Sequence, residues 1–193
     1  MTVSRRDFLR LLGGGAAALG AGCISRPTRP AEVELSSDAR ALVRLAWAGL
    51  DPAQVVDVHA HIVGTGTGGT GCWVHEDSSS FTSPIRLFKT RVYKDAAGVW
   101  SDDEADALFV ERLADLVLDQ RPRGRTVLLA FDQHHDAQGR PVPELTEFYT
   151  PNDYIISLVK RWPQLFLFGC SVHPYRKDAL EELTRCRAAG AVS

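Results

Sequence analysis

The stretch that most constrains the fold is residues 55–62, which read Val-Val-Asp-Val-His-Ala-His-Ile. Its apolar residues are mostly β-branched, a composition that favours a β-strand. Side chains alternate between the two faces of a strand, so Asp57, His59 and His61 are predicted to share one face. The apolar positions of the stretch are predicted to pack under helices on the other face: Val56, Val58, Ala60 and Ile62.

Two imidazoles on one strand face can hold the same metal ion. The alternative is a buried strand whose histidines are only hydrogen-bonded, and the His-x-His spacing alone does not separate the two interpretations. Asp57 stands two positions before His59. Because a metal-binding histidine commonly needs a carboxylate or carbonyl partner that fixes its tautomer, Asp57 favours the metal site.

Three further motifs extend this pattern. The segment 57–61 is followed by Gly-Cys-Ser-Val-His-Pro at 169–174, by Asp-Ala-Leu-Glu-Glu-Leu at 178–183 and by Ala-Gly-Ala at 189–191. Together they resemble the amidohydrolase superfamily, in particular the branch that includes aminocarboxymuconate-semialdehyde decarboxylase and metal-dependent hydrolases. The resemblance covers roughly residues 55–193. It implies an α/β fold, the N-terminal portion of a (β/α)8 TIM barrel with a metal at its carboxyl-terminal mouth.

The resemblance also implies a chemistry. His59 and His61 would hold a divalent metal ion, with zinc as the first expectation, and Asp57 would support them. In a hydrolase of this type, metal-activated water attacks a carbonyl group of a small-molecule substrate. In the related lyases the same metal site serves decarboxylation. The resemblance assigns no further catalytic residue.

Three side chains just beyond predicted strand ends are candidate substrate-binding residues. Asp132 and His134 follow an apolar strand, and His173 follows the next one. The active site of a barrel lies at the carboxyl ends of its strands, so these residues are expected at its rim. A solvated polar loop is the alternative for Asp132 and His134. His173 is interpreted as a substrate-side polar residue in preference to a metal ligand.

The rest of the pattern alternates strands with helices, as a parallel α/β sheet requires. After the first strand, strands are predicted at 126–131 and 165–172, with a fourth beginning at 191–193. Helices are predicted at 37–49, at 101–119 behind a capping box, at 150–162 and at 177–189. The long connection 63–99 opens with a glycine-rich run that lacks the ending of a P-loop, and it is predicted to be a mobile lid.

Length and composition bound the remaining possibilities. Of 193 residues, 45% are hydrophobic and 24% charged, the balance of a globular domain. The net charge is −2 and basic runs are short, so no nucleic-acid partner is expected. A complete barrel takes about 250 residues, so 37–193 is predicted to be a truncated barrel of three to four strands. A non-catalytic exported fragment or a partner-dependent half-barrel is the alternative, with self-association through open sheet edges.

The N-terminal segment has the form of a twin-arginine export signal. Arg5 and Arg6 precede an apolar pair and a glycine-rich, weakly hydrophobic run, so residues 1–22 are interpreted as the signal segment. Cys23 follows Gly20-Ala21-Gly22, which resembles a lipoprotein cleavage site, and a lipidated Cys23 would anchor the protein to a membrane. Residues 23–36 are then an extended tether. The expected location is the periplasm or cell envelope.

Replacing Arg5 and Arg6 together by Lys is expected to retain the protein in the cytoplasm, because this export route reads the arginine pair. Cell fractionation of the full chain, followed by immunoblotting, measures the distribution. Arg26→Lys lies outside the signal and is the matched control, expected to leave export unchanged. An unchanged distribution of the double variant would contradict the signal.

Overall fold

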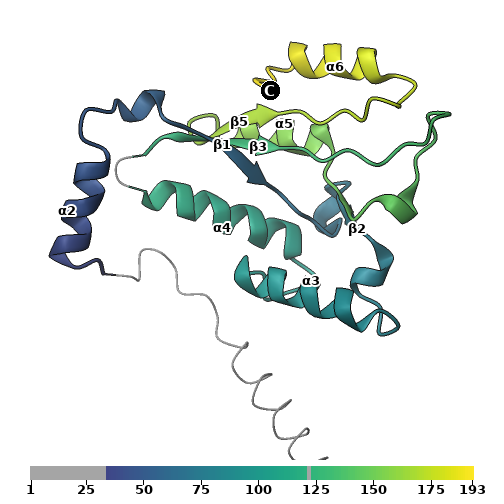
Figure 1. Cartoon of the computed structure of the whole chain (residues 1–193), viewed down its shortest axis with the longest axis horizontal. Coiled ribbons are helices and arrows are strands. Elements are labelled where there is room, and N and C mark those ends of the chain that lie inside the picture. The colour runs from purple at the N-terminus through teal and green to yellow at the C-terminus, as the bar shows by residue number, and fades with distance from the viewer. Residues whose placement is uncertain (1–33, 121–122) are drawn as a thin grey trace, which may run out of the picture.

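Three parallel strands form the central sheet of the computed structural model, which describes residues 34–120 and 123–193 (Figure 1). They are β1 (Val56–His61), β3 (Arg125–Leu129) and β5 (Phe166–Gly169), in the order β1-β3-β5. The predicted α/β class with parallel strands is confirmed. The segment 191–193 forms backbone hydrogen bonds along β5. Val192 N donates to Phe168 O at 2.8 Å, and Cys170 N donates to Ser193 O at 2.9 Å.

The helices between the strands pack into one core. They are α4 (Ala105–Asp119), α5 (Asn152–Arg161) and α6 (Ala179–Ala188). All three contribute to a single buried cluster with side chains from one sheet face, where Ala60 pairs with Leu128 and Leu128 with Phe168. The buried apolar members are Ile62, Val110, Ala114, Val117, Leu128, Ala130, Ile155, Leu158, Leu165, Phe166, Phe168 and Cys186.

The opposite sheet face is tightly packed near its centre. Val127 is buried there, and an added Cβ at Gly169 would lie 2.5 Å from Leu129 Cδ2 and 2.9 Å from Val127 Cγ1. Such distances leave no space for a side chain at Gly169. The glycine therefore lets β3 side chains cover the end of β5.

An irregularity in β1 changes the predicted face of one residue. Asp57 pairs with Thr126 and His61 pairs with Leu129, with a register shift between them. Thr126 and Leu129 point to opposite faces of β3, so Asp57 and His61 also point to opposite faces. The expectation that Asp57 shares the face of both histidines is therefore wrong, because an extra residue interrupts the alternation.

The open edge of β1 also overturns the expected burial of its apolar face. Val58 is 68% exposed, although it was predicted to pack under helices. β1 has only β3 as a neighbour in the described sheet, and the irregularity falls at this position. Ile62, beyond the irregularity, is fully buried as predicted.

The connection 63–99, predicted to be a mobile lid, contains regular secondary structure. It contains β2 (Trp73–Val74), which pairs antiparallel with β4 (Phe148–Tyr149), and α3 (Pro84–Ala96). Short 3-10 turns complete the described elements: η2 (Pro52–Gln54), η3 (Thr67–Gly69), η4 (Glu76–Ser78) and η5 (Pro143–Leu145).

The glycine-rich run is held by a buried carboxylate. Asp106, 1% exposed, accepts from Thr65 N at 2.5 Å, from Gly66 N at 3.1 Å and from the hydroxyl of Thr70. A Cβ at Gly64 would lie 2.5 Å from this carboxylate, which explains a glycine there. The amides that could cradle a phosphate therefore already bind an internal anion, in agreement with the missing P-loop ending.

Helix α4 begins later than predicted. The helix expected from the capping box at 101–104 begins at Ala105, and its N-cap Glu104 makes no side-chain capping bond. Asp106 in the first turn faces the loop instead. The first described helix, α2 (Ser37–Ala46), is capped by Ser36 and has no buried residue. It stands apart from the sheet in Figure 1.

The predictions for the signal segment 1–22, for Cys23 and for most of the tether 23–36 lie outside the described residues. Within 34–120 and 123–193, no helix has the length and apolar character needed to cross a bilayer.

Asp106→Asn is expected to lower the free energy of unfolding by at least about 2 kcal/mol, because an amide cannot accept from all the donors that surround the carboxylate. Chemical denaturation followed by circular dichroism measures the loss. The exposed Asp103, close by in sequence, provides the control Asp103→Asn, expected to change stability by less than about 0.5 kcal/mol. Equal stability of Asp106→Asn and wild type would contradict the role of Asp106.

Candidate functional site

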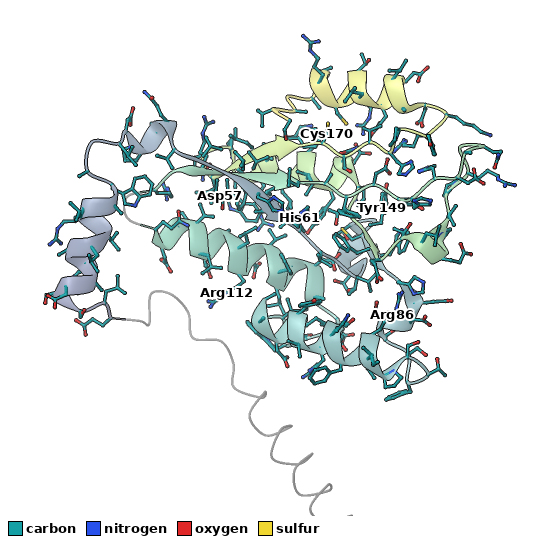
Figure 2. The ribbon with its side chains drawn as sticks, viewed as in Figure 1. Asp57, His61, Arg86, Arg112, Tyr149 and Cys170 are labelled. Atoms are coloured by element: carbon teal, nitrogen blue, oxygen red, sulfur yellow. The ribbon has the colours of Figure 1, made fainter. Side chains whose placement is uncertain are left out.

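The carboxyl ends of the three parallel strands meet at one edge of the sheet. His61 is the last residue of β1, Asp132 follows β3, and His173 follows β5. Figure 2 shows Asp57 near the start of β1 and His61 further along the same strand. Open parallel sheets and barrels bind their ligands at this edge. The candidate residues that end or follow the three strands therefore lie where a ligand would bind.

His59 and His61 form a close pair, here called the histidine pair. Their ring centroids lie 5.0 Å apart with the ring planes at 82°. His59 is exposed, whereas Nδ1 of His61 is buried and has no hydrogen-bond partner. Burial and the neighbouring His59 lower the pKa of His61 below its ordinary value. His61 is therefore uncharged at neutral pH, with an unsatisfied ring nitrogen.

Two phenylalanines shield the ring of His61 on the side toward β3 and β4. Its centroid lies 6.0 Å from that of Phe131 and 6.4 Å from that of Phe148. The two phenylalanine rings are themselves 4.2 Å apart. Phe131 is held by Thr150, through paired backbone bonds of 3.0 and 2.9 Å. The hydroxyl of Thr150 donates to Ile62 O at 2.6 Å, so the end of β1 is fixed to the same structure.

Asp57 acts on the backbone of the histidine pair. Its Oδ1 accepts a hydrogen bond from His59 N at 3.1 Å. This contact stabilises the irregular part of β1. The described contact of Asp57 is therefore with the main chain of His59 and not with its ring.

A pocket of about 450 Å³ lies beyond β3 and β5, and here it is called the histidine pocket. The three candidate substrate-binding residues, Asp132, His134 and His173, all line it. The remaining lining residues are Phe131, Leu145, Thr146, Glu147, Ser171, Val172 and Pro174. Phe131 thus contacts the histidine pair through His61 and also forms part of the pocket wall.

Asp132 organises the floor of the pocket. Its side chain is 5% exposed and accepts from His173 N at 2.8 Å and from Arg176 Nη1 at 3.2 Å. A third bond comes from Gln133 N at 2.9 Å. The backbone N of Asp132 donates to Ser171 Oγ at 3.1 Å. Asp132 therefore fixes both the segment that follows β3 and the segment that follows β5.

Three imidazoles converge on the pocket. The ring centroid of His173 lies 5.1 Å from that of His134 and 5.4 Å from that of His135. His135, which sequence reasoning left out, is buried behind the pocket wall, and its Nδ1 lies 2.9 Å from Gln133 O. Burial, His134 and His135 lower the pKa of His173, against an opposing effect of Asp132. His173 is therefore uncharged at neutral pH.

A second network that sequence reasoning missed supports Ser171. Asn152 Nδ2 donates to Ser171 O at 3.0 Å, and Ser171 N donates to Asn152 Oδ1 at 3.0 Å. Asn152 Nδ2 also donates to Glu182 Oε1 at 2.8 Å. Asn152 lies beside Asp153 in a polar helix start, so its polar character alone does not distinguish it. Its partners are distant in sequence.

The residues present fit part of a metal site. The histidine pair offers two neighbouring imidazoles, and the unsatisfied Nδ1 of His61 has a lone pair that a metal could use. Among residues 34–120 and 123–193, no group of three or more His, Cys, Asp or Glu side chains could hold a metal ion. The described residues therefore do not form a complete metal site, which needs more donors than the two imidazoles of the histidine pair.

Comparison of the chain with protein family models, with curated proteins and with solved structures found no match. The resemblance to the amidohydrolase superfamily thus rests on the sequence motifs. Geometry of this chain's own residues carries the functional conclusions below.

Glu182→Gln is expected to reduce the dependence of stability on acid pH. Bonds from Arg185, and then from Asn152, lower the pKa of Glu182 from 4.5 to about 2. A lowered pKa stabilises the fold above the ordinary value of the carboxyl and loses this effect as pH falls toward the folded-state value. The wild-type unfolding free energy should therefore drop between about pH 5 and about pH 2, and the variant should show a smaller drop.

Urea denaturation at several pH values measures this difference, with the exposed neighbour Glu181→Gln as the matched control. If Glu182→Gln and wild type lose stability in parallel, the network does not couple Glu182 to folding.

Proposed function

We propose that the chain is a metal-dependent hydrolase of the amidohydrolase type, in which His59 and His61 supply two ligands of a divalent metal ion, with zinc as the expected ion. Substrate lies in the adjacent histidine pocket. Support comes from the position of both features at the carboxyl edge of one parallel sheet.

The sheet is proposed to be the N-terminal portion of a (β/α)8 barrel. Three parallel strands in chain order, joined by right-handed crossovers, carry their helices on one face both in a barrel and in one half of a doubly wound sheet. Here α4, α5 and α6 all share one core cluster with the same face of the sheet. The other face carries Val127, Leu129 and the close approach at Gly169, as expected for strands that fill a barrel interior.

The observation that carries the metal proposal is Nδ1 of His61. A buried polar atom without a partner is rare, and each case requires an explanation. Ligation would satisfy the nitrogen. The lowered pKa agrees, because a metal takes the neutral form of an imidazole, which His61 holds at neutral pH.

A bound divalent ion supplies a Lewis acid that activates water and polarises a carbonyl group. The chain's own residues orient the reactants. Phe131 and Phe148 exclude solvent from one side of His61. Asp132 fixes the backbone of His173, and the uncharged ring of His173 is available to hydrogen-bond a substrate oxygen. Decarboxylation by a lyase of the same superfamily would use the same arrangement.

A second candidate is a partner-dependent half-barrel. Val58 is 68% exposed on the open edge of β1, and the described residues offer two ligands only. A strand from another molecule could pair with β1 and bring further donors, so self-association through this edge is part of the proposal.

Export by the twin-arginine route would place this protein in the periplasm or cell envelope. A lipid attached to Cys23 would in addition anchor it to a membrane.

Replacing His59 and His61 together by Ala is expected to abolish stoichiometric zinc binding by the full chain. Equilibrium dialysis against zinc followed by elemental analysis measures the bound metal. The control is His75→Ala, since His75 lies outside both the histidine pair and the pocket and its Nδ1 already accepts from Asp77 N at 3.2 Å. Unaltered zinc content in the double variant would place the metal elsewhere or exclude it.

A further inference from the structure

The histidine pocket contains basic groups that lack acidic partners. His134 and His173 line it, and His135 lies directly behind His173. Within the described part of the chain, the ring hydrogen bonds of these residues involve backbone atoms: Gln133 O for His135 and Tyr175 N for His173. No carboxylate there hydrogen-bonds to any of the three rings. Unpaired imidazoles in a cavity are suited to an anion that arrives from outside.

The acidic side chains around the pocket are already paired. Asp132 is bonded to Arg176, which also bonds Asp178 at 2.8 Å. Glu147 at the rim faces Arg86, with 3.2 Å between Oε1 and Nη2. Because these carboxylates are paired with arginines, the imidazoles are the groups of the pocket that can gain charge when a ligand enters.

The ring of His173 is held in one orientation. Tyr175 N donates to its Nδ1 at 3.3 Å, so the neutral ring carries its proton on Nε2 and can donate it to a ligand. Asp132 fixes the backbone of the same residue through the 2.8 Å bond. The apolar wall of Phe131, Leu145, Val172 and Pro174 would contact the body of a small organic molecule.

We propose that this pocket binds the anionic end of a small organic ligand, with the rings of His134 and His173 facing the anion and His135 behind them. The proposal concerns recognition by the pocket and goes beyond the proposed metal-dependent hydrolysis. It does not require a metal, so the two can fail separately.

Binding is coupled to proton uptake. Without a ligand, burial and mutual repulsion disfavour the charged form of His173. An anion favours the protonated form of a neighbouring imidazole, so the complex binds more protons than the free protein. Affinity for an anion must therefore rise as pH falls. The charged groups that face the cluster are Asp132, Glu147, Arg176 and Asp178, and each is engaged in an ion pair.

Isothermal titration of the full chain tests this with benzoate, phenyl phosphate and the neutral analogue benzamide. Benzoate or phenyl phosphate should bind roughly tenfold or more tightly at about pH 5.5 than at about pH 7.5, since one linked proton changes the affinity by up to about tenfold per pH unit. Benzamide should show no such gain. Which anion binds more tightly separates a carboxylate ligand from a phosphate ligand.

Heat measured in two buffers of different ionisation enthalpy should show net proton uptake on anion binding. His173→Gln and His134→Gln should each weaken anion binding at least about fivefold and reduce the uptake, whereas His75→Gln should not. The double variant of His59 and His61 to Ala should still bind the anion. Equal affinity for benzoate and benzamide, or anion binding without proton uptake by the wild type, would overturn the proposal.

Discussion

The carboxylate of Asp132 connects the two strand ends on which the candidate pocket depends. A nearly buried charge is stable only when it is paired and hydrogen-bonded, and Asp132 obtains its partners from the segment after β5: His173 N and Arg176. The requirement of one buried charge thus fixes the distance between loops that lie far apart in sequence. It also leaves the rings of His134 and His173 free of any acidic partner within the described structure.

Asp106 has a similar role in the loop that follows β1. The glycine run after β1 exposes backbone N–H groups that need acceptors once they are buried. Asp106 reaches them from the first turn of α4, and its own backbone N donates to the hydroxyl oxygen of Thr67 at 3.1 Å. One carboxylate fixes each loop that borders the site. Both loops are therefore set by long-range polar contacts and not by local turn chemistry.

Local patterns predicted the parts of this fold that depend on local physics. Alternating and continuous apolar runs predicted the strands β1, β3 and β5. Apolar residues at helical spacing predicted the helices α4, α5 and α6. Because parallel strands end at a common edge, the positions of Asp132, His134 and His173 just after strands were enough to predict their proximity. The irregularity in β1 and the bonds of Asp106 and of Glu182 to Asn152 depend on distant residues. No periodicity in the sequence contains them.

The irregularity in β1 matters for what the histidine pair can do. The ring centroids of His59 and His61 are 5.0 Å apart, and Asp57 bonds the backbone at His59 on the irregular segment. Asp57 therefore holds the main chain of the segment that carries His59. A carboxylate in this role acts on the backbone and needs no contact with either ring.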